Sequence, residues 1–425
     1  MKLKIKESGL WFFIGVVSNI SIFQIGGNTI FTYCLYLYPL IFAVLGEKIE
    51  IRKNNLAIYV GVSFLSAIIC LSNSQMQGWY VKTVISFMNI LWSYILYCFL
   101  IRKEDMMYYF VRGLYCGGIA HFCFWAAQVF TSKIFGVDLN HLLFGISSQF
   151  KGNEMVYSGL AIHAGILVPT IVVAILLSDK FYIKVLIMIF GCYTRNTTTL
   201  LTICFYCMVV ICVEYIPSLF KKMKRIKPKR IIQMILGAFI LAIVYSKTQL
   251  ANVVNNSFDR VFTIINGNFT SGSDATHMRY LTSFPYIVRH TNWINILFGN
   301  GIGTSGFVMS KFFHQYTDMI WTIECDWLDI FYSVGAIGWL IIYGNLLYIA
   351  IAGYKVSRKY SVYTITIIAA GAFYNFHLQW LIIFEFLLTL CIKKKIDIWN
   401  YKEYFIHRKD QISESVISNN DKLRF

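Results

Sequence analysis

Apolar runs long enough to cross a bilayer, about 20 residues each, recur along most of this chain. Of its 425 residues, 57% are hydrophobic and only 14% are charged. A soluble protein of this length covers its exterior with charged side chains, and too few are present here to do so. The sequence therefore predicts an all-α polytopic membrane protein.

We expect about twelve membrane spans, each an apolar helix. The basic start and first apolar run are typical of a signal peptide, but no A-x-A-like cleavage site follows. We therefore expect the first helix to be retained. The spans are expected near residues 10–26, 29–46, 55–72, 79–101, 106–130, 158–178, 181–194, 196–216, 231–248, 326–353, 360–375 and 378–392.

The net charge of +17 is distributed as in a membrane protein and not as in a nucleic-acid binder. Most of the 38 lysines and arginines lie in alternate short connections and in the C-terminal tail. Short cytoplasmic loops attract such an excess of positive charge. We therefore expect a multi-pass protein of the cytoplasmic membrane with both termini in the cytoplasm and no nucleic-acid partner.

One connection is far longer than the others. Residues 249–325 form a loop of mixed polarity, which this topology places outside the cytoplasm. Loops of this length in a compact protein are usually functional. The predicted parts are membrane helices in 1–248, the large extracytoplasmic loop in 249–325, membrane helices in 326–395 and a cytoplasmic tail in 396–425.

From Gly301 the loop reads G-x-G-x-x-G, the spacing of a dinucleotide-binding turn. That turn requires a preceding strand and a following helix in a βαβ unit, whereas membrane helices flank this one. We therefore expect no nucleotide cofactor. Gly299, Gly301 and Gly303 are interpreted as positions of permissive backbone, where the loop folds close to a substrate between an arginine-bearing arm and an acidic helix start.

Four arginines are candidates for binding a phosphate group, because the planar guanidinium donates two parallel hydrogen bonds. Arg260, Arg279 and Arg289 lie in the large loop, and Arg195 lies between two apolar runs at the outer membrane boundary. The alternative is that the loop arginines face lipid headgroups. Arg195 can equally lie in a plain turn and extend to water.

Carboxylates begin the first span after the loop. Glu324 and Asp326 stand just before it, and Asp329 follows one turn later. A carboxylate at a low-dielectric edge can act as a general base, although these acids can equally stabilise the start of a helix. His314 is a candidate acid–base partner, and Glu385 is an intramembrane acid. We expect no metal, because two carboxylates alone make a weak site.

Two segments together resemble a known family. LFGNGIG at 297–303, followed by ECDWLDIFYSVGAIG at 324–338, is similar to the C-terminal signature of Wzy-type O-antigen and capsular polysaccharide polymerases, whose superfamily includes O-antigen ligases. The motif match covers residues 190–340, and topology alone extends it. The family's loop arginines, Ser/Thr-Arg pair and closing G-x-x-G match Arg260, Arg279, Thr194-Arg195, Gly335 and Gly338.

The resemblance implies a GT-C-like membrane architecture and a glycosyltransferase without a cofactor. Such an enzyme transfers the growing glycan from undecaprenyl pyrophosphate to a sugar hydroxyl of the next lipid-linked unit, on the outer face of the membrane. Arginines would neutralise the leaving pyrophosphate, and Glu324 or Asp326 would be the base. The implied partners are the lipid-linked oligosaccharide, membrane lipids, a flippase and a chain-length regulator.

Three other functions stay open. O-antigen ligases usually carry a His where this chain has Glu324, which favours a polymerase. A flippase of lipid-linked oligosaccharides also has about twelve spans, but repeat symmetry and short loops are expected of it. A metal-dependent transferase using polyprenyl-phosphate sugars needs an acidic pair in its first outer loop, and residues 26–28 contain no acid.

Overall fold

The fold is almost entirely helical. The computed structural model describes residues 7–25, 28–44, 54–148, 150–151, 154–161, 166–194, 197–217, 287–289, 291–308, 323, 325–375 and 379–400, with the single positions 255, 259 and 284. Within these residues, strands occur only as two antiparallel pairs of two residues each. They are β1 (Gln24–Ile25) with β2 (Asn28–Thr29), and β3 (Phe150–Lys151) with β4 (Glu154–Met155).

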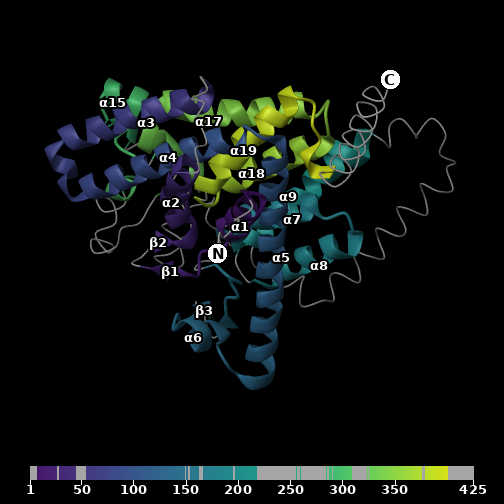
Figure 1. Cartoon of the computed structure of the whole chain (residues 1–425). Helices are drawn as coiled ribbons and strands as arrows, with labels where there is room; N and C mark the ends of the chain where they lie inside the picture. The colour runs from purple at the N-terminus through teal and green to yellow at the C-terminus, as the bar shows by residue number, and fades with distance from the viewer. Residues whose placement is uncertain are drawn as a thin grey trace, which may run out of the picture.

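The helices carry the labels of Figure 1. The α-helices are α1 (Glu7–Ser18), α2 (Ile30–Val44), α3 (Asn55–Ser72), α4 (Tyr80–Leu100), α5 (Glu104–Phe135), α6 (Leu139–Phe144), α7 (Leu167–Leu177), α8 (Phe181–Tyr193), α9 (Thr197–Val210), α15 (Trp293–Phe298), α17 (Asp326–Gly353), α18 (Arg358–Gly371) and α19 (Gln379–Lys393). Shorter elements are the 3₁₀-helices η1 (Ser74–Trp79) and η5 (Ile398–Asn400) and the π-helix η3 (Ile211–Tyr215).

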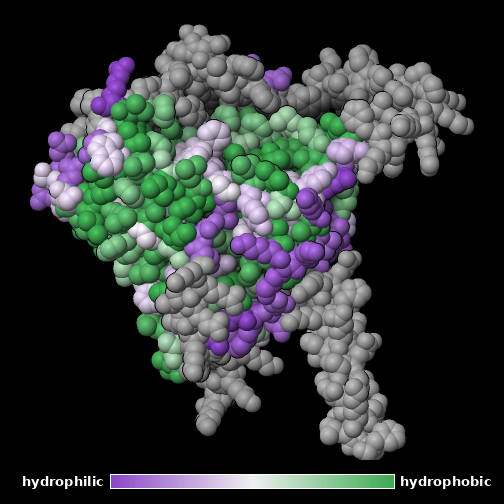
Figure 2. Space-filling view, turned by 90° about the horizontal axis from the view of Figure 1, so that it is seen from above, coloured by the Kyte–Doolittle hydropathy of each residue, from purple (hydrophilic) through white to green (hydrophobic). Residues whose placement is uncertain are grey.

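Four helical stretches of the described chain are long and apolar enough to cross a membrane. They are Asn55–Ser72, Ser74–Leu100, Thr198–Tyr215 and Asp326–Gly353, with 18, 27, 18 and 28 residues. Large apolar side chains such as Phe64 of α3 and Leu340 of α17 point outward from them, and Figure 2 shows apolar residues over much of the face seen from above.

These features are those of a helical membrane protein. Because water-exposed surfaces of soluble monomers rarely carry apolar patches of this extent, the outward side chains fit a lipid environment. The count of twelve spans stays a prediction. The expected span at 231–248 and most of the expected loop at 249–325 lie outside the described residues.

Most of the helices share one large apolar core. Trp11 of α1 stacks on Phe42 of α2, which in turn packs on Phe99 of α4. Figure 1 shows α3, α4, α15 and α17 together at the upper left, while α5 runs downward to β3 and α6. Alpha-helix α1 packs along α5, where a Cβ on Gly15 would lie only 2.2 Å from the carbonyl oxygen of Phe110. Small residues of this kind let membrane helices approach to backbone contact.

Two predicted spans differ from the observed helices. The span expected at 10–26 is helical only to Ser18, and in the span expected at 158–178 the helix begins at Leu167. Instead of helix, the chain at 157–161 turns through Gly159, which has a φ of +60°. The amides of residues 21 and 22 donate to the carbonyl oxygen of Leu160, at 3.1 and 3.0 Å, so the two interrupted segments pair with each other.

Candidate functional site

The glycine segment after α15 adopts a backbone that few other residues can adopt. The φ angles of Gly299, Gly301 and Gly303 are +87°, +111° and +73°. Residues with a Cβ rarely occupy this region, because the side chain then collides with its own backbone. A helix, α15, precedes the turn where a dinucleotide-binding fold has a strand. We call residues 299–305 the glycine loop.

The glycine loop packs against a break in α17. Gly335, with φ +70° and ψ −174°, interrupts that helix. The break removes helical partners from the preceding carbonyl groups, and the loop supplies new ones. The amides of Asn300 and Gly301 donate to the carbonyl oxygens of Tyr332 and Ser333, at 2.9 and 3.1 Å.

This contact is so close that side chains are excluded from it. A Cβ on Gly299 would lie 2.2 Å from the carbonyl oxygen of Ser333. A Cβ on Gly335 would lie 2.4 Å from the carbonyl carbon of Leu297. Helix α3 adds a third side, because the hydroxyl of Ser66 donates to Ser333 and accepts from the amide of Gly301 at 2.9 Å. The loop is therefore fixed in position by α3 and α17.

The two described carboxylates at the start of α17 differ in their surroundings. Asp326 is 1% exposed, and the hydroxyl of Tyr343 donates to its Oδ2 at 2.7 Å. Asp329 is only half-buried and accepts hydrogen bonds on both oxygens. The hydroxyl of Ser305, at the end of the glycine loop, donates to Oδ1, and the Nδ2 of Asn375 donates to Oδ2 at 2.6 Å. Asp329 therefore joins the glycine loop to the segment after α18.

A lysine also lies beside the loop. Lys82, in the first turn of α4, is half-buried, with its Nζ 5.0 Å from the centre of the Trp79 ring. A Cβ on Gly303 would lie 3.4 Å from the Cε of Lys82. The charge of Lys82 is also close enough to interact with that of Asp329. A cation and a carboxylate therefore lie beside the same loop.

Lys82 and Asn375 were not among the residues that the sequence indicated. Lys82 did carry a usable signal. It is a lysine near the first residues of the apolar run at 79–101, and the charge pattern places that end of the run outside the cytoplasm. Asn375 carried none, because an asparagine between two apolar runs is typical of a turn. Cys325, which directly precedes α17, is not a candidate nucleophile, because burial raises the pKa of its thiol to about 12.

Several predicted site residues lie elsewhere. Arg289 is helical and exposed in the short described segment 287–289. Glu385 is fully buried within α19. No group of three or more His, Cys, Asp or Glu side chains suited to a metal occurs among the described residues. Arg195, Arg260, Arg279, His314 and Glu324 lie outside them.

A second polar centre lies on α5. The Nε2 of His121 donates to the carbonyl oxygen of Asn19 at 2.6 Å, and its Nδ1 accepts from the amide of Leu160 at 3.0 Å. Two turns further along, Gln128 accepts from the amide of Gly159 at 2.9 Å. We call these five residues the His121 cluster. It joins the two interrupted segments to α5.

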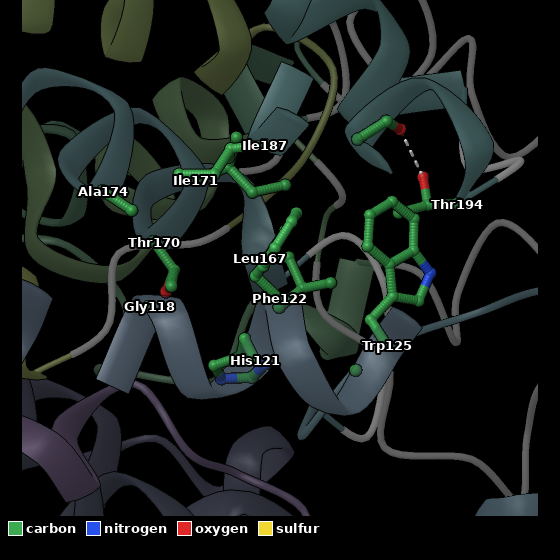
Figure 3. A pocket seen from close by; sticks show the side chains of 12 residues that line it. Gly118, His121, Phe122, Trp125, Leu167, Thr170, Ile171, Ala174, Ile187 and Thr194 are labelled. Carbon is green, nitrogen blue, oxygen red and sulfur yellow. Dashed lines mark hydrogen bonds between the residues drawn. The ribbon is translucent and has the colours of Figure 1, made fainter. Parts of the chain in front are cut away.

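A small, mostly apolar pocket adjoins the His121 cluster. Figure 3 shows side chains from α5, α7 and α8 around it. The hydroxyl of Thr194 donates to the carbonyl oxygen of Gly191 at 2.8 Å. Because the polar groups of His121 and Thr194 are bonded within the chain, the pocket offers mainly apolar contact. Its lining includes His121, Trp125, Leu167, Thr170, Ile187 and Thr194.

The chain matches no protein-family model and no curated protein sequence.

Proposed function

We propose that this protein is a polymerase of lipid-linked oligosaccharide repeat units. It transfers the growing glycan from undecaprenyl pyrophosphate to a sugar hydroxyl of the next unit, on the outer face of the cytoplasmic membrane. The single observation that carries the proposal is the glycine loop, which packs against α17 and has both Lys82 and Asp329 beside it. A glycosyl transfer needs a carboxylate for the incoming hydroxyl and a cation for the leaving pyrophosphate.

The resemblance of 297–303 and 324–338 to Wzy-type polymerases supports the same proposal. In that family's pattern the glycines precede an acidic helix start, and here they pack against the same helix. The orientation rests on the basic connections. Lys103 pairs with Glu7, and Lys394 pairs with Glu104, both at 2.6 Å, which brings three predicted cytoplasmic segments together.

The first test is the surface glycan of a deletion strain carrying variants of the gene. We expect Arg279→Ala and Glu324→Ala to abolish long-chain glycan, because each removes a charge that the resemblance to Wzy-type polymerases implies for the site. Single repeat units should accumulate outside the cytoplasm. The measurement is the glycan length profile by gel electrophoresis, with Lys133→Ala, an exposed lysine at the end of α5, as the control variant.

The outcomes separate the alternatives. Single units that stay on the cytoplasmic side would favour a flippase. Full-length glycan that stays on its lipid carrier would favour a ligase. If both variants reach the membrane and produce a normal length profile, the proposed roles of Arg279 and Glu324 are wrong.

A further inference from the structure

We propose that Asp329 and Lys82 are the reacting carboxylate and the pyrophosphate-binding cation of this site. This inference rests on the proposed function and assigns residues to it. Asp329 accepts the proton of the attacking hydroxyl, and Lys82 binds the pyrophosphate of the donor beside the glycine loop.

The surroundings of Asp329 suit a proton acceptor that touches substrate. Its two oxygens accept one hydrogen bond each, from Ser305 and Asn375, and a carboxylate has further lone pairs available. Ser305 is itself fixed, because its oxygen accepts from the amide of Ile323 at 3.1 Å. Ser305 and Asn375 are therefore positioning residues that hold the carboxylate in one orientation.

The neighbouring carboxylate is less accessible. Asp326 is 1% exposed and bonded to Tyr343, whereas Asp329 is half-buried and faces the glycine loop. A general base must come within hydrogen-bond distance of the proton that it removes. Among the described carboxylates at the start of α17, Asp329 meets this requirement better than Asp326.

Lys82 is suited to binding an anion for three reasons. It packs on the glycine loop at Gly303, so that its charge is held next to that loop. It is half-buried, so that water screens its charge less than at an open surface. Its described contacts are a ring, Trp79, and the charge of Asp329, and in the described structure no carboxylate forms an ion pair with it within 4.0 Å. A point charge of this kind is a common ligand of phosphate groups.

The transfer that these two residues would support is balanced without a metal or a redox partner. The hydroxyl oxygen of the incoming unit forms a bond to the anomeric carbon of the growing glycan. The bond from that carbon to the pyrophosphate oxygen breaks, and its electron pair leaves with undecaprenyl pyrophosphate. The hydroxyl proton passes to Asp329, and Lys82 offsets the negative charge that develops on the leaving group.

The test uses the full chain in nanodiscs and two readouts. The first is binding of farnesyl diphosphate, with farnesol as the uncharged control and phosphatidylglycerol as a competing headgroup. The second is polymer formation from lipid-linked repeat units. The variants are Lys82→Met, Lys82→Arg and Asp329→Asn, with Lys133→Met as a matched loss of one positive charge, and thermal unfolding identifies any variant that fails to fold.

We expect Lys82→Met to weaken farnesyl diphosphate binding at least about tenfold, while Lys82→Arg and Lys133→Met retain it. Farnesol should bind the wild type and Lys82→Met equally, and phosphatidylglycerol should not compete. Asp329→Asn should retain binding and lower the polymerisation rate by about 10²- to 10⁴-fold. Ser305→Ala, a smaller change, should lower kcat with KM unchanged.

Failure of the inference and failure of the proposed function give different results. If the wild type polymerises and both Lys82→Met and Asp329→Asn do so at its rate, the residue assignment is overturned and the function stands. Competition by phosphatidylglycerol would reassign Lys82 to the lipid surface. If the wild type binds farnesyl diphosphate through Lys82 but joins no units, the polymerase proposal and the role of Asp329 fail, and the anion site alone remains.

Discussion

The glycine loop and the His121 cluster are two places where the chain leaves the helical pattern inside a helical protein, and they differ in how their polar groups are used. In the His121 cluster, both ring nitrogens of His121 and the amide of Gln128 bond to the backbone of the interrupted segments. At the glycine loop, the backbone is bonded as well, but Lys82 and Asp329 lie half-buried beside it.

The difference separates a structural break from a candidate site. In a bilayer, non-helical backbone is tolerated where protein groups satisfy it or where it lines a cavity. In the His121 cluster, protein groups satisfy the backbone, since side chains replace the missing helical hydrogen bonds. Beside the glycine loop lie the charges of Lys82 and Asp329, which the hydrogen bonds of the loop backbone do not require. Charged side chains are costly in a membrane protein, and they usually have a function there.

The largest effect is expected from filling the closest contact of the glycine loop. Gly335→Ala places a Cβ about where Leu297 already lies and forces a positive φ on alanine. We expect the free energy of unfolding to fall by about 3 kcal/mol or more. The control is Gly344→Ala on the same helix, where a Cβ meets nothing within 4 Å. Thermal unfolding in detergent measures both, and equal midpoints would contradict the loop contact.

An intermediate effect is expected at the His121 cluster. His121→Leu removes the ring nitrogens that bond to the carbonyl of Asn19 and to the amide of Leu160. We expect a loss of about 2–4 kcal/mol in the free energy of unfolding, because each buried group loses a hydrogen bond. The exposed His141 provides the control, His141→Leu. Loss of farnesyl diphosphate binding without loss of stability would instead make the cluster part of the site.

The smallest effect is expected next to the His121 cluster, at α6, where Asp138 caps the helix and Asn140 accepts a hydrogen bond from Gln128. Partial burial favours a higher pKa for Asp138, but hydrogen bonds outweigh it and hold the pKa below the ordinary value of 3.8. The donors are the amide and hydroxyl of Ser148 and the amides of His141 and Asn140. We expect Asp138→Ala to cost about 1 kcal/mol at pH 7.

The sign of the pH dependence follows from that lowered pKa. The folded state binds the proton of Asp138 less tightly than the unfolded state, so the stabilisation is complete above pH 3.8. It is lost as the pH falls below that value through the folded-state pKa. Hydrogen exchange at the amide of Ser148 measures it. A difference between wild type and Asp138→Ala that persists unchanged at the lowest pH would contradict the assignment.

Hydropathy predicted some helices closely and others poorly. The span expected at 55–72 coincides with α3, and the span expected at 79–101 lies within one residue of α4 at each end. The spans at 10–26 and 158–178 were too long, because apolar composition says nothing of a hydrogen bond between Leu160 and residues 21 and 22. Contacts of such sequence separation are invisible to a sliding window.

The candidate site also has features that the sequence predicted and features that it did not. The glycine spacing and the acids after residue 323 are local patterns, and the sequence indicated both. The partners of Asp329 are not local, because Ser305 and Asn375 lie 24 and 46 residues away along the chain. Lys82 is still more distant, on a helix that the sequence associated only with the membrane.

The sequence by itself determined that this is a helical membrane protein and that its glycine segment needs a permissive backbone, since both follow from composition and from residues next to each other. Only the tertiary structure decided what that segment touches. The break at Gly335 leaves carbonyl groups that the glycine loop satisfies, and that packing brings Asp329 and Lys82 to the same loop. Their proximity depends on how α4 and α17 pack, which no stretch of the chain records locally.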